Sequence, residues 1–174
     1  MAKNIFTERL GEALAVAELS RRGYIATTFS SNVPQIDIIA IGSTGASTIQ
    51  VKTNAKGEFH VDASEWLELV QQDGIQSVVG KKRRLNPNLV WVFVHPGKVY
   101  GEDLFFICTE SEFQESVKKG YEELLVKNEG ARKRRPEATH IVMHFDENLS
   151  DCKDKWEKVG QALDGGESCV GPAK

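Results

Sequence analysis

The sequence predicts a mixed α/β fold, and three observations point to it. A helical apolar pattern covers residues 4–22. Three short apolar runs follow at 24–29, 35–41 and 47–53, and they have the composition of strands in a meander. Forty percent of the 174 residues are hydrophobic, which is enough for a sizeable buried core.

Composition limits the possible classes of protein. We expect a single domain over residues 1–163 and a disordered, glycine-rich tail over 164–174. No apolar run approaches the ~18 residues of a membrane span, and the N-terminus lacks the apolar segment of a signal peptide. The three cysteines form no CxxC pair, so neither a disulfide framework nor a zinc ribbon is indicated. We therefore expect a reduced, cytoplasmic protein.

The first helix is predicted from apolar residues at helical spacing, which we expect to face the core. These residues are Phe6, Leu10, Ala13, Leu14 and Ala17. Gly23 is a plausible end of the helix, with Arg21 and Arg22 in its last turn. Residues 30–34 and the Gly-Ser-Thr-Gly segment 42–45 are predicted to be turns between the strands.

Three more helices are predicted further along the chain. Ser64 is an N-cap candidate for a helix that begins with Glu-Trp-Leu. Ser111 and Gln114 have the spacing of a capping box, which predicts a helix over 112–126. A last helix is predicted over 154–163.

Strands are predicted at 89–94, 104–108 and 140–145, from their apolar and β-branched composition. Three large aromatic residues are expected to be core residues: Trp66, Trp91 and Phe93.

Four polar residues stand out against this apolar background. Asp37 is the only charge in its strand, and burying a carboxylate is costly unless it has a partner or a cation. Gln50 and Lys52 lie two residues apart, so they share one face of the neighbouring strand. Glu12 falls on the helix beside a second apolar patch, formed by Ile5, Val16 and Leu19. We expect these four side chains to converge at one end of the sheet.

The order of these residues resembles the PD-(D/E)xK phosphodiesterase superfamily, in its resolvase-like and homing-endonuclease-like branches. The resemblance covers about residues 7–55 and is carried by four segments: Leu10-Gly11-Glu12-Ala13, Arg22-Gly23-Tyr24, Gln35-Ile36-Asp37-Ile38-Ile39-Ala40 and Gln50-Val51-Lys52-Thr53. It implies the restriction-endonuclease-like αβββαβ core, in which helices flank a central mixed sheet. It also implies a Mg²⁺-dependent DNA endonuclease, with Mn²⁺ as a possible substitute.

The resemblance assigns roles to individual residues. Asp37 is the central metal ligand, Glu12 is the helix carboxylate, and Lys52 is the motif lysine, which we expect to act as a positive charge rather than as a base. Gln50 stands where most members have Glu or Asp, and the carbonyl of Val51 completes the metal shell. A neutral amide brings no charge, so metal affinity should fall, although some active branches use glutamine here.

Two basic runs are candidates for contacts with nucleic acid phosphates. They are Lys81, Lys82, Arg83 and Arg84, and then Arg132, Lys133, Arg134 and Arg135. Each is equally compatible with a solvated loop. The formal net charge of −3 argues against binding by bulk electrostatics but not against a local basic groove.

The function favoured by these features is hydrolysis of DNA phosphodiester bonds by a homodimer or higher homo-oligomer, since cutting both strands needs two sites or two events. A catalytically inactive nuclease-fold protein that binds nucleic acid or a protein partner is the alternative. The target sequence or structure, and the choice between DNA and RNA, stay open.

Overall fold

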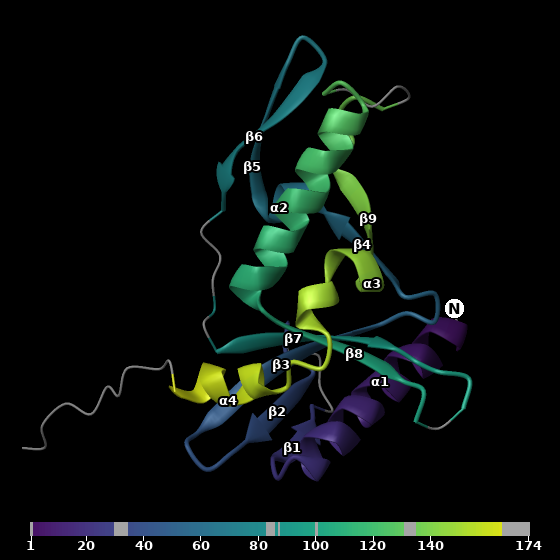
Figure 1. The fold of residues 1–174 in the computed structure, drawn as a ribbon, viewed down its shortest axis with the longest axis vertical. Helices are drawn as coiled ribbons and strands as arrows, with labels where there is room; N and C mark the ends of the chain where they lie inside the picture. Colours follow the sequence, from purple (N-terminus) through teal and green to yellow (C-terminus); the bar gives the residue numbers. More distant parts are fainter. Residues whose placement is uncertain are drawn as a thin grey trace, which may run out of the picture.

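The computed structural model describes residues 2–29, 35–82, 86, 88–99, 101–130 and 135–164. Its helices and strands follow one another along the chain as shown in Figure 1. In order they are α1 (Ala2–Arg21), β1 (Ile25–Thr28), β2 (Ile38–Ile41), β3 (Ala46–Thr53), β4 (Glu58–Asp62), the 3-10 turn η1 (Ala63–Glu65), β5 (Leu67–Gln72), β6 (Ile75–Lys81), β7 (Leu89–His95), β8 (Leu104–Thr109), α2 (Glu110–Lys127), β9 (His140–His144), α3 (Phe145–Asn148), the 3-10 turn η2 (Ser150–Cys152) and α4 (Glu157–Asp164).

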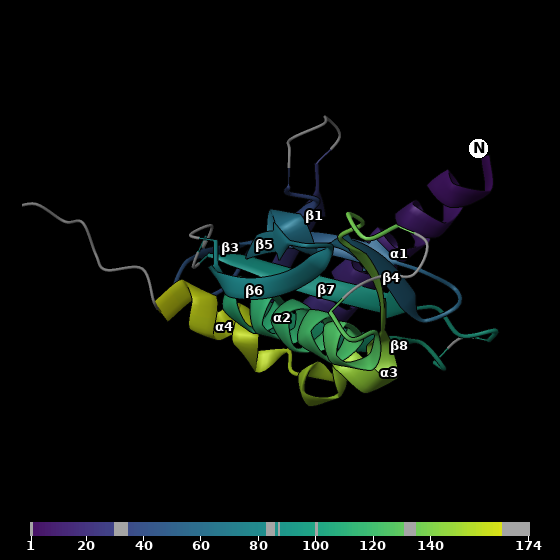
Figure 2. The same cartoon turned by 90° about the horizontal axis from the view of Figure 1, so that it is seen from above.

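A five-stranded mixed sheet forms the centre of the fold, with strand order β1-β2-β3-β7-β8. β3 and β7 run parallel, and the other neighbours are antiparallel. Helices α1 and α4 pack on one face of this sheet, whereas α2 lies over the other (Figures 1 and 2). The predicted α/β class, a central mixed sheet flanked by helices, is confirmed.

β7 separates two hydrophobic cores because its residues alternate between them. The core on the side of α1 and α4 contains three valines of β7 and two residues of β3: Val90, Val92, Val94, Ile49 and Val51. The residues that alternate with these along β3 point to the other face of the sheet. Trp91 and Phe93 face α2, where they pack with Trp66 and Phe113. The prediction that Trp66, Trp91 and Phe93 are core residues is confirmed.

The helix predicted from Ser64 is wrong. Asp62 caps only one 3-10 turn, accepting a hydrogen bond from the Ser64 amide, and the chain then forms the β5–β6 hairpin. Asp73 and Gly74 form its two-residue turn, and both have positive φ angles, as a type I′ hairpin turn requires. The Asp-Gly pair is the hairpin signal that outweighs the helix N-cap. The hairpin projects beyond the central sheet in Figure 1.

The face of α1 that packs on the sheet differs from the predicted one. Gly11, Ala15 and Leu19 are buried, whereas Phe6 is 74% exposed and Leu10 is 47% exposed. The reason is steric, since small residues let the helix approach the sheet closely, and apolar periodicity gives glycine and alanine little weight.

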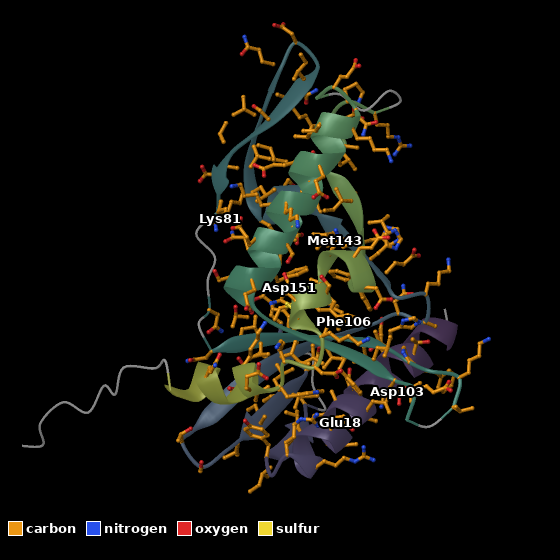
Figure 3. The ribbon with its side chains drawn as sticks, in the orientation of Figure 1. Glu18, Lys81, Asp103, Phe106, Met143 and Asp151 are labelled. Atoms are coloured by element: carbon orange, nitrogen blue, oxygen red, sulfur yellow. The ribbon has the colours of Figure 1, made fainter. Side chains whose placement is uncertain are left out.

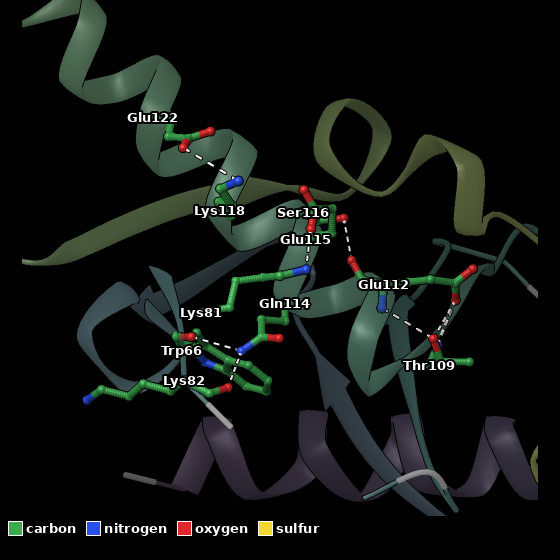
Figure 4. A network of polar contacts seen from close by, with 10 residues as sticks. All are labelled: Trp66, Lys81, Lys82, Thr109, Glu112, Gln114, Glu115, Ser116, Lys118 and Glu122. Carbon is green, nitrogen blue, oxygen red and sulfur yellow. Dashed lines mark hydrogen bonds and ion pairs between the residues drawn. The ribbon is translucent and has the colours of Figure 1, made fainter. Parts of the chain in front are cut away.

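α2 begins two residues before the predicted start. Its capping box is Thr109 with Glu112, in place of Ser111 with Gln114, as Figure 4 shows. Gln114 is instead buried, and its amide donates to the carbonyls of Trp66 and Lys82. It therefore ties α2 to the start of β5 and the end of β6.

The C-terminal part carries β9, which pairs antiparallel with β4, and then three short helical segments. The last predicted helix is present as α4 but begins at Glu157 rather than at 154. Residues 165–174 of the predicted tail lie outside the described residues, as does the predicted turn at 30–34. Within the described part, no helix is long and apolar enough to cross a membrane.

Candidate active site

The β2–β3 hairpin places Asp37 beside Gln50. The register pairs Ile38 with Ile49, and the Asp37 amide donates to the Ile49 carbonyl at 2.8 Å, so Asp37 lies opposite Gln50 and on the same face. Oδ2 of Asp37 accepts hydrogen bonds from Nε2 of Gln50 at 2.8 Å and from the Val51 amide at 2.7 Å. Two donors therefore hold this carboxylate in one orientation.

Glu12 reaches the same place from α1. Gly11 brings this turn of the helix against Thr53 at the end of β3, where an added Cβ would lie 1.7 Å from Oγ1 of Thr53. Burial raises the pKa of Glu12, and the neighbouring Asp37 carboxylate raises it further. The two acids therefore repel each other across the cleft, and a cation between them would relieve this repulsion.

Lys52 lies two residues beyond Gln50 on the same face of β3, with its Nζ 6.0 Å from the centre of the Phe59 ring. All four predicted side chains, with Val51, line one cleft of about 420 Å³. The cleft is lined by Glu8, Glu12, Asp37, Gln50, Val51, Lys52, Thr53, Asn54, Glu58, Phe59, His60 and Phe145.

A second pocket of about 340 Å³ continues this cleft toward η1. The two hollows share Gln50, Lys52, Phe59 and His60. The second also includes Gln35, Val61, Asp62, Glu65, Trp66 and Trp91. The two pockets therefore adjoin at these residues and form one groove, with Lys52 in the lining of both.

Three further polar residues, outside the predicted set of four, line this cleft: Glu8, Glu58 and His60. Glu8 lies one turn before Glu12 on α1, and Glu58 and His60 belong to β4, whose position depends on its pairing with β9. Lys56 lies 3.8 Å from Glu58, so one of the added acids is partly neutralised. The local signal for Glu58 and His60 was their position soon after the Gln-Val-Lys strand.

The donor set fits a hard divalent cation. Among the described residues, no group of three or more His, Cys, Asp and Glu side chains is arranged as a metal site. The cleft instead offers the carboxylates of Glu12 and Asp37 with the amide oxygen of Gln50. Within the described part, nothing donates to Oδ1 of Asp37, which is therefore available to a ligand. Oxygen ligands with only two carboxylates are typical of Mg²⁺, which keeps several waters.

The basic runs are described only in part. Lys81 and Lys82 end the β5–β6 hairpin, where Nζ of Lys81 lies 2.7 Å from Glu115, as Figure 4 shows. Nζ of Lys82 donates to the carbonyl of Ser64, next to Glu65 in the second pocket. Arg135 is exposed, and the remaining predicted contacts lie outside the described residues: Arg83, Arg84, Arg132, Lys133 and Arg134.

Comparison with known proteins supports a nuclease fold. The structure resembles that of a bacterial homing endonuclease, I-Ssp6803I, with a TM-score of 0.51 and 12% sequence identity. The match covers 94% of this chain and 97% of the other. At this identity the likeness shows the fold alone. No protein-family model matches the chain, and no curated protein matches its sequence.

Proposed function

We propose that this protein is a metal-dependent endonuclease of the PD-(D/E)xK type that hydrolyses phosphodiester bonds in DNA. The observation that carries the proposal is the convergence of Glu12, Asp37, Gln50 and Lys52 in one cleft. The likeness to a bacterial homing endonuclease supports the nuclease class and DNA as the substrate.

In this proposal, Glu12 and Asp37 hold the cation with anionic oxygens, and Gln50 and the carbonyl of Val51 add neutral ones. A bound Mg²⁺ or Mn²⁺ lowers the pKa of a coordinated water and neutralises the charge that develops on the phosphate. Gln50 has a second task, because its amide nitrogen fixes the Asp37 carboxylate from the opposite strand.

Lys52 supplies the positive charge in this arrangement. Its ammonium group lies over the face of the Phe59 ring, and both residues line the cleft. From there it stabilises the attacking water or the phosphate as a point charge. The groove that continues past Lys52 provides room for the polymer on both sides of the scissile bond.

We also propose that the active species is a homodimer or a higher homo-oligomer. One chain provides one cleft of this composition in its described part, whereas cutting a duplex needs two sites or two events. Light scattering of the purified chain at the concentration used for cleavage tests this point directly, and a single monomeric mass under those conditions would contradict it.

The central test is plasmid cleavage in Mg²⁺ or Mn²⁺. We expect the unaltered chain to cleave, and Asp37→Asn and Lys52→Ala to lose at least a hundredfold in rate. Asp146→Asn and Lys98→Ala make the same changes of charge away from the cleft and should cleave normally. Equal cleavage by all five proteins would point to a contaminant, and DNA retention without cleavage would favour an inactive nuclease fold that binds nucleic acid.

A further inference from the structure

Two buried thiols lie together on the α2 side of the central sheet. Cys108 on β8 and Cys152 in η2 belong to the same hydrophobic core. A bridge between Phe106 and Lys153, and a 2.9 Å hydrogen bond from the Asp154 amide to the Phe105 carbonyl, hold η2 beside β8. The thiols of Cys108 and Cys152 lie close enough for each to shift the pKa of the other. Phe106, two residues before Cys108, and Asp151, directly before Cys152, are labelled in Figure 3 and show where the two segments of chain that carry the pair lie.

A lysine completes the arrangement. Nζ of Lys158, on α4, lies 3.7 Å from Sγ of Cys152 and 2.9 Å from Oε1 of Glu112. Only 11% of the Lys158 side chain is exposed, so solvent screens its charge weakly. The Cys152 sulfur therefore accepts a hydrogen bond from the ammonium group and has a second thiol as a neighbour.

The two thiols are thereby made chemically unequal. The neighbouring Cys108 thiol, together with Lys158, lowers the pKa of Cys152. The neighbouring Cys152 sulfur, together with burial, raises the pKa of Cys108. Cys152 is thus the thiol that ionises first, and the thiolate is the reactive form of cysteine.

Cys152 is 5% exposed and borders a pocket at the protein surface. It lines a surface pocket of about 390 Å³ between α2 and the α3–η2 segment, together with Glu112, Ser116, Asn148 and Asp151. This pocket shares no residue with the cleft that holds Asp37 and Lys52. The cysteine pair therefore serves no step of phosphodiester hydrolysis.

We propose that Cys152, activated by Lys158, is a peroxide-reactive thiol and that Cys108 is its resolving partner. The Cys152 thiolate attacks one oxygen of hydrogen peroxide, an S–O bond forms, the O–O bond breaks, and the leaving hydroxide takes up a proton to become water. Cys108 then attacks the sulfenic sulfur, the S–S bond forms, the S–O bond breaks, and the Cys108 proton leaves with the hydroxide as a second water. In sum, two thiols are oxidised to a disulfide, and one peroxide is reduced to two waters.

The test uses the full chain with Cys169→Ser, so that only this pair is present. After treatment with hydrogen peroxide, we expect an intact mass lower by two hydrogen atoms and a cross-linked peptide that joins Cys108 to Cys152. Alkylation of the thiols before and after denaturation counts the free cysteines independently and needs no substitution at Cys108 or Cys152. Two free thiols after peroxide treatment would overturn the proposal.

The order of events is tested by the single cysteine variants in the same background. With Cys108→Ser, Cys152 should stop at the sulfenic acid and be labelled by dimedone. With Cys152→Ser, Cys108 should remain unlabelled, and labelling of Cys108 in its place would contradict the assigned roles. Circular dichroism checks that each variant is folded.

The role of Lys158 is tested with a matched lysine from the same region. Lys158→Met should slow disulfide formation by about threefold to tenfold, because the thiolate is less stabilised. Lys155→Met removes the same charge from an exposed position and should leave the rate unchanged. Equal rates for Lys158→Met and the parent would overturn the activation by Lys158.

Discussion

The amide nitrogen of Gln50 donates a 2.8 Å hydrogen bond to Oδ2 of Asp37, the acid that we propose as the central metal ligand. Gln50→Glu would replace this donor with a second carboxylate. Without a divalent cation, we expect the variant to be less stable by about 1–3 kcal/mol, since a hydrogen bond becomes a repulsion at a largely buried position. With Mg²⁺ the added charge should tighten binding, as measured by titration calorimetry. An unchanged Mg²⁺ affinity would show that residue 50 is not a ligand.

Glu12 provides a pH-dependent prediction. Burial and the Asp37 carboxylate raise its pKa above the ordinary value of 4.5. Because this acid holds its proton more tightly in the folded state, its contribution to stability falls as the pH rises from below 4.5 through the folded pKa. Glu12→Gln should therefore raise the Tm by roughly 1–4 °C at neutral pH without metal. The gain in Tm should disappear in buffers below pH 4.5, where Glu12 is protonated in the folded and in the unfolded state.

The same pair of proteins tests the cation. Mg²⁺ should raise the Tm of the unaltered chain more than that of Glu12→Gln, because a ligand that binds only the folded state stabilises it. Glu123→Gln removes an exposed carboxylate on α2 and serves as the matched control in both experiments. If Glu123→Gln changes the Tm as much as Glu12→Gln does, the effect comes from net charge in general and not from the cleft.

Gly11 is a position at which the packing of the fold and the geometry of the site are coupled. Gly11→Ala places a methyl group within 1.7 Å of Oγ1 and 2.7 Å of Cβ of Thr53, so α1 must move away from β3. We expect a loss of about 1–3 kcal/mol in urea unfolding, although alanine favours a helix over glycine by about 1 kcal/mol. Cleavage should fall as well, because Glu12 moves with the helix.

Gly120→Ala is the control for this substitution. Gly120 lies within α2, where an added Cβ would meet Asn148 and Ile141 at 3.6 and 3.7 Å, which are ordinary contacts. This variant should be as stable as the parent or more so. Thr53→Ala should recover part of the stability that Gly11→Ala loses, because it removes the Oγ1 atom that the new methyl group meets. If the double variant is as unstable as Gly11→Ala alone, the contact with Thr53 is not the cause of the loss.

The part of the site that could be predicted from sequence is local. Asp37, Gln50 and Lys52 belong to one hairpin, so strand alternation and a short turn are sufficient to bring them together. Glu12 could be placed because its helix neighbours indicated a second apolar patch. Its exact approach depends on Gly11 and Thr53, a contact between residues far apart in sequence that periodicity does not encode.

The rest of the cleft depends on long-range pairing. Glu58 and His60 are positioned by β4, which pairs with β9 more than 80 residues later. The β5–β6 hairpin was missed because Asp62 and Ser64 form a good helix cap, and only the Asp73-Gly74 turn shows that a hairpin follows. Local capping signals predicted a helix here that the tertiary structure does not contain.

The described lysines at the end of β6 give a prediction about DNA binding. Lys81 forms an ion pair with Glu115. Lys82 donates a hydrogen bond to the carbonyl of Ser64, the residue before Glu65 in the lining of the second pocket. If both contact phosphates, Lys81→Gln with Lys82→Gln should weaken binding and lower the slope of log K against log salt by about 2. Fluorescence anisotropy with a labelled duplex over a salt series measures both quantities.

Two further variants make this experiment decisive. Lys118→Gln with Lys119→Gln removes the same charge from α2, from residues that line neither hollow of the groove, and should leave the salt slope unchanged. Glu115→Gln frees Lys81 from its ion pair and should strengthen binding, because the ammonium group then meets the phosphate without a competing carboxylate. If both double variants lower the slope equally, the lysines act only through net charge, and the end of β6 is not part of the DNA surface.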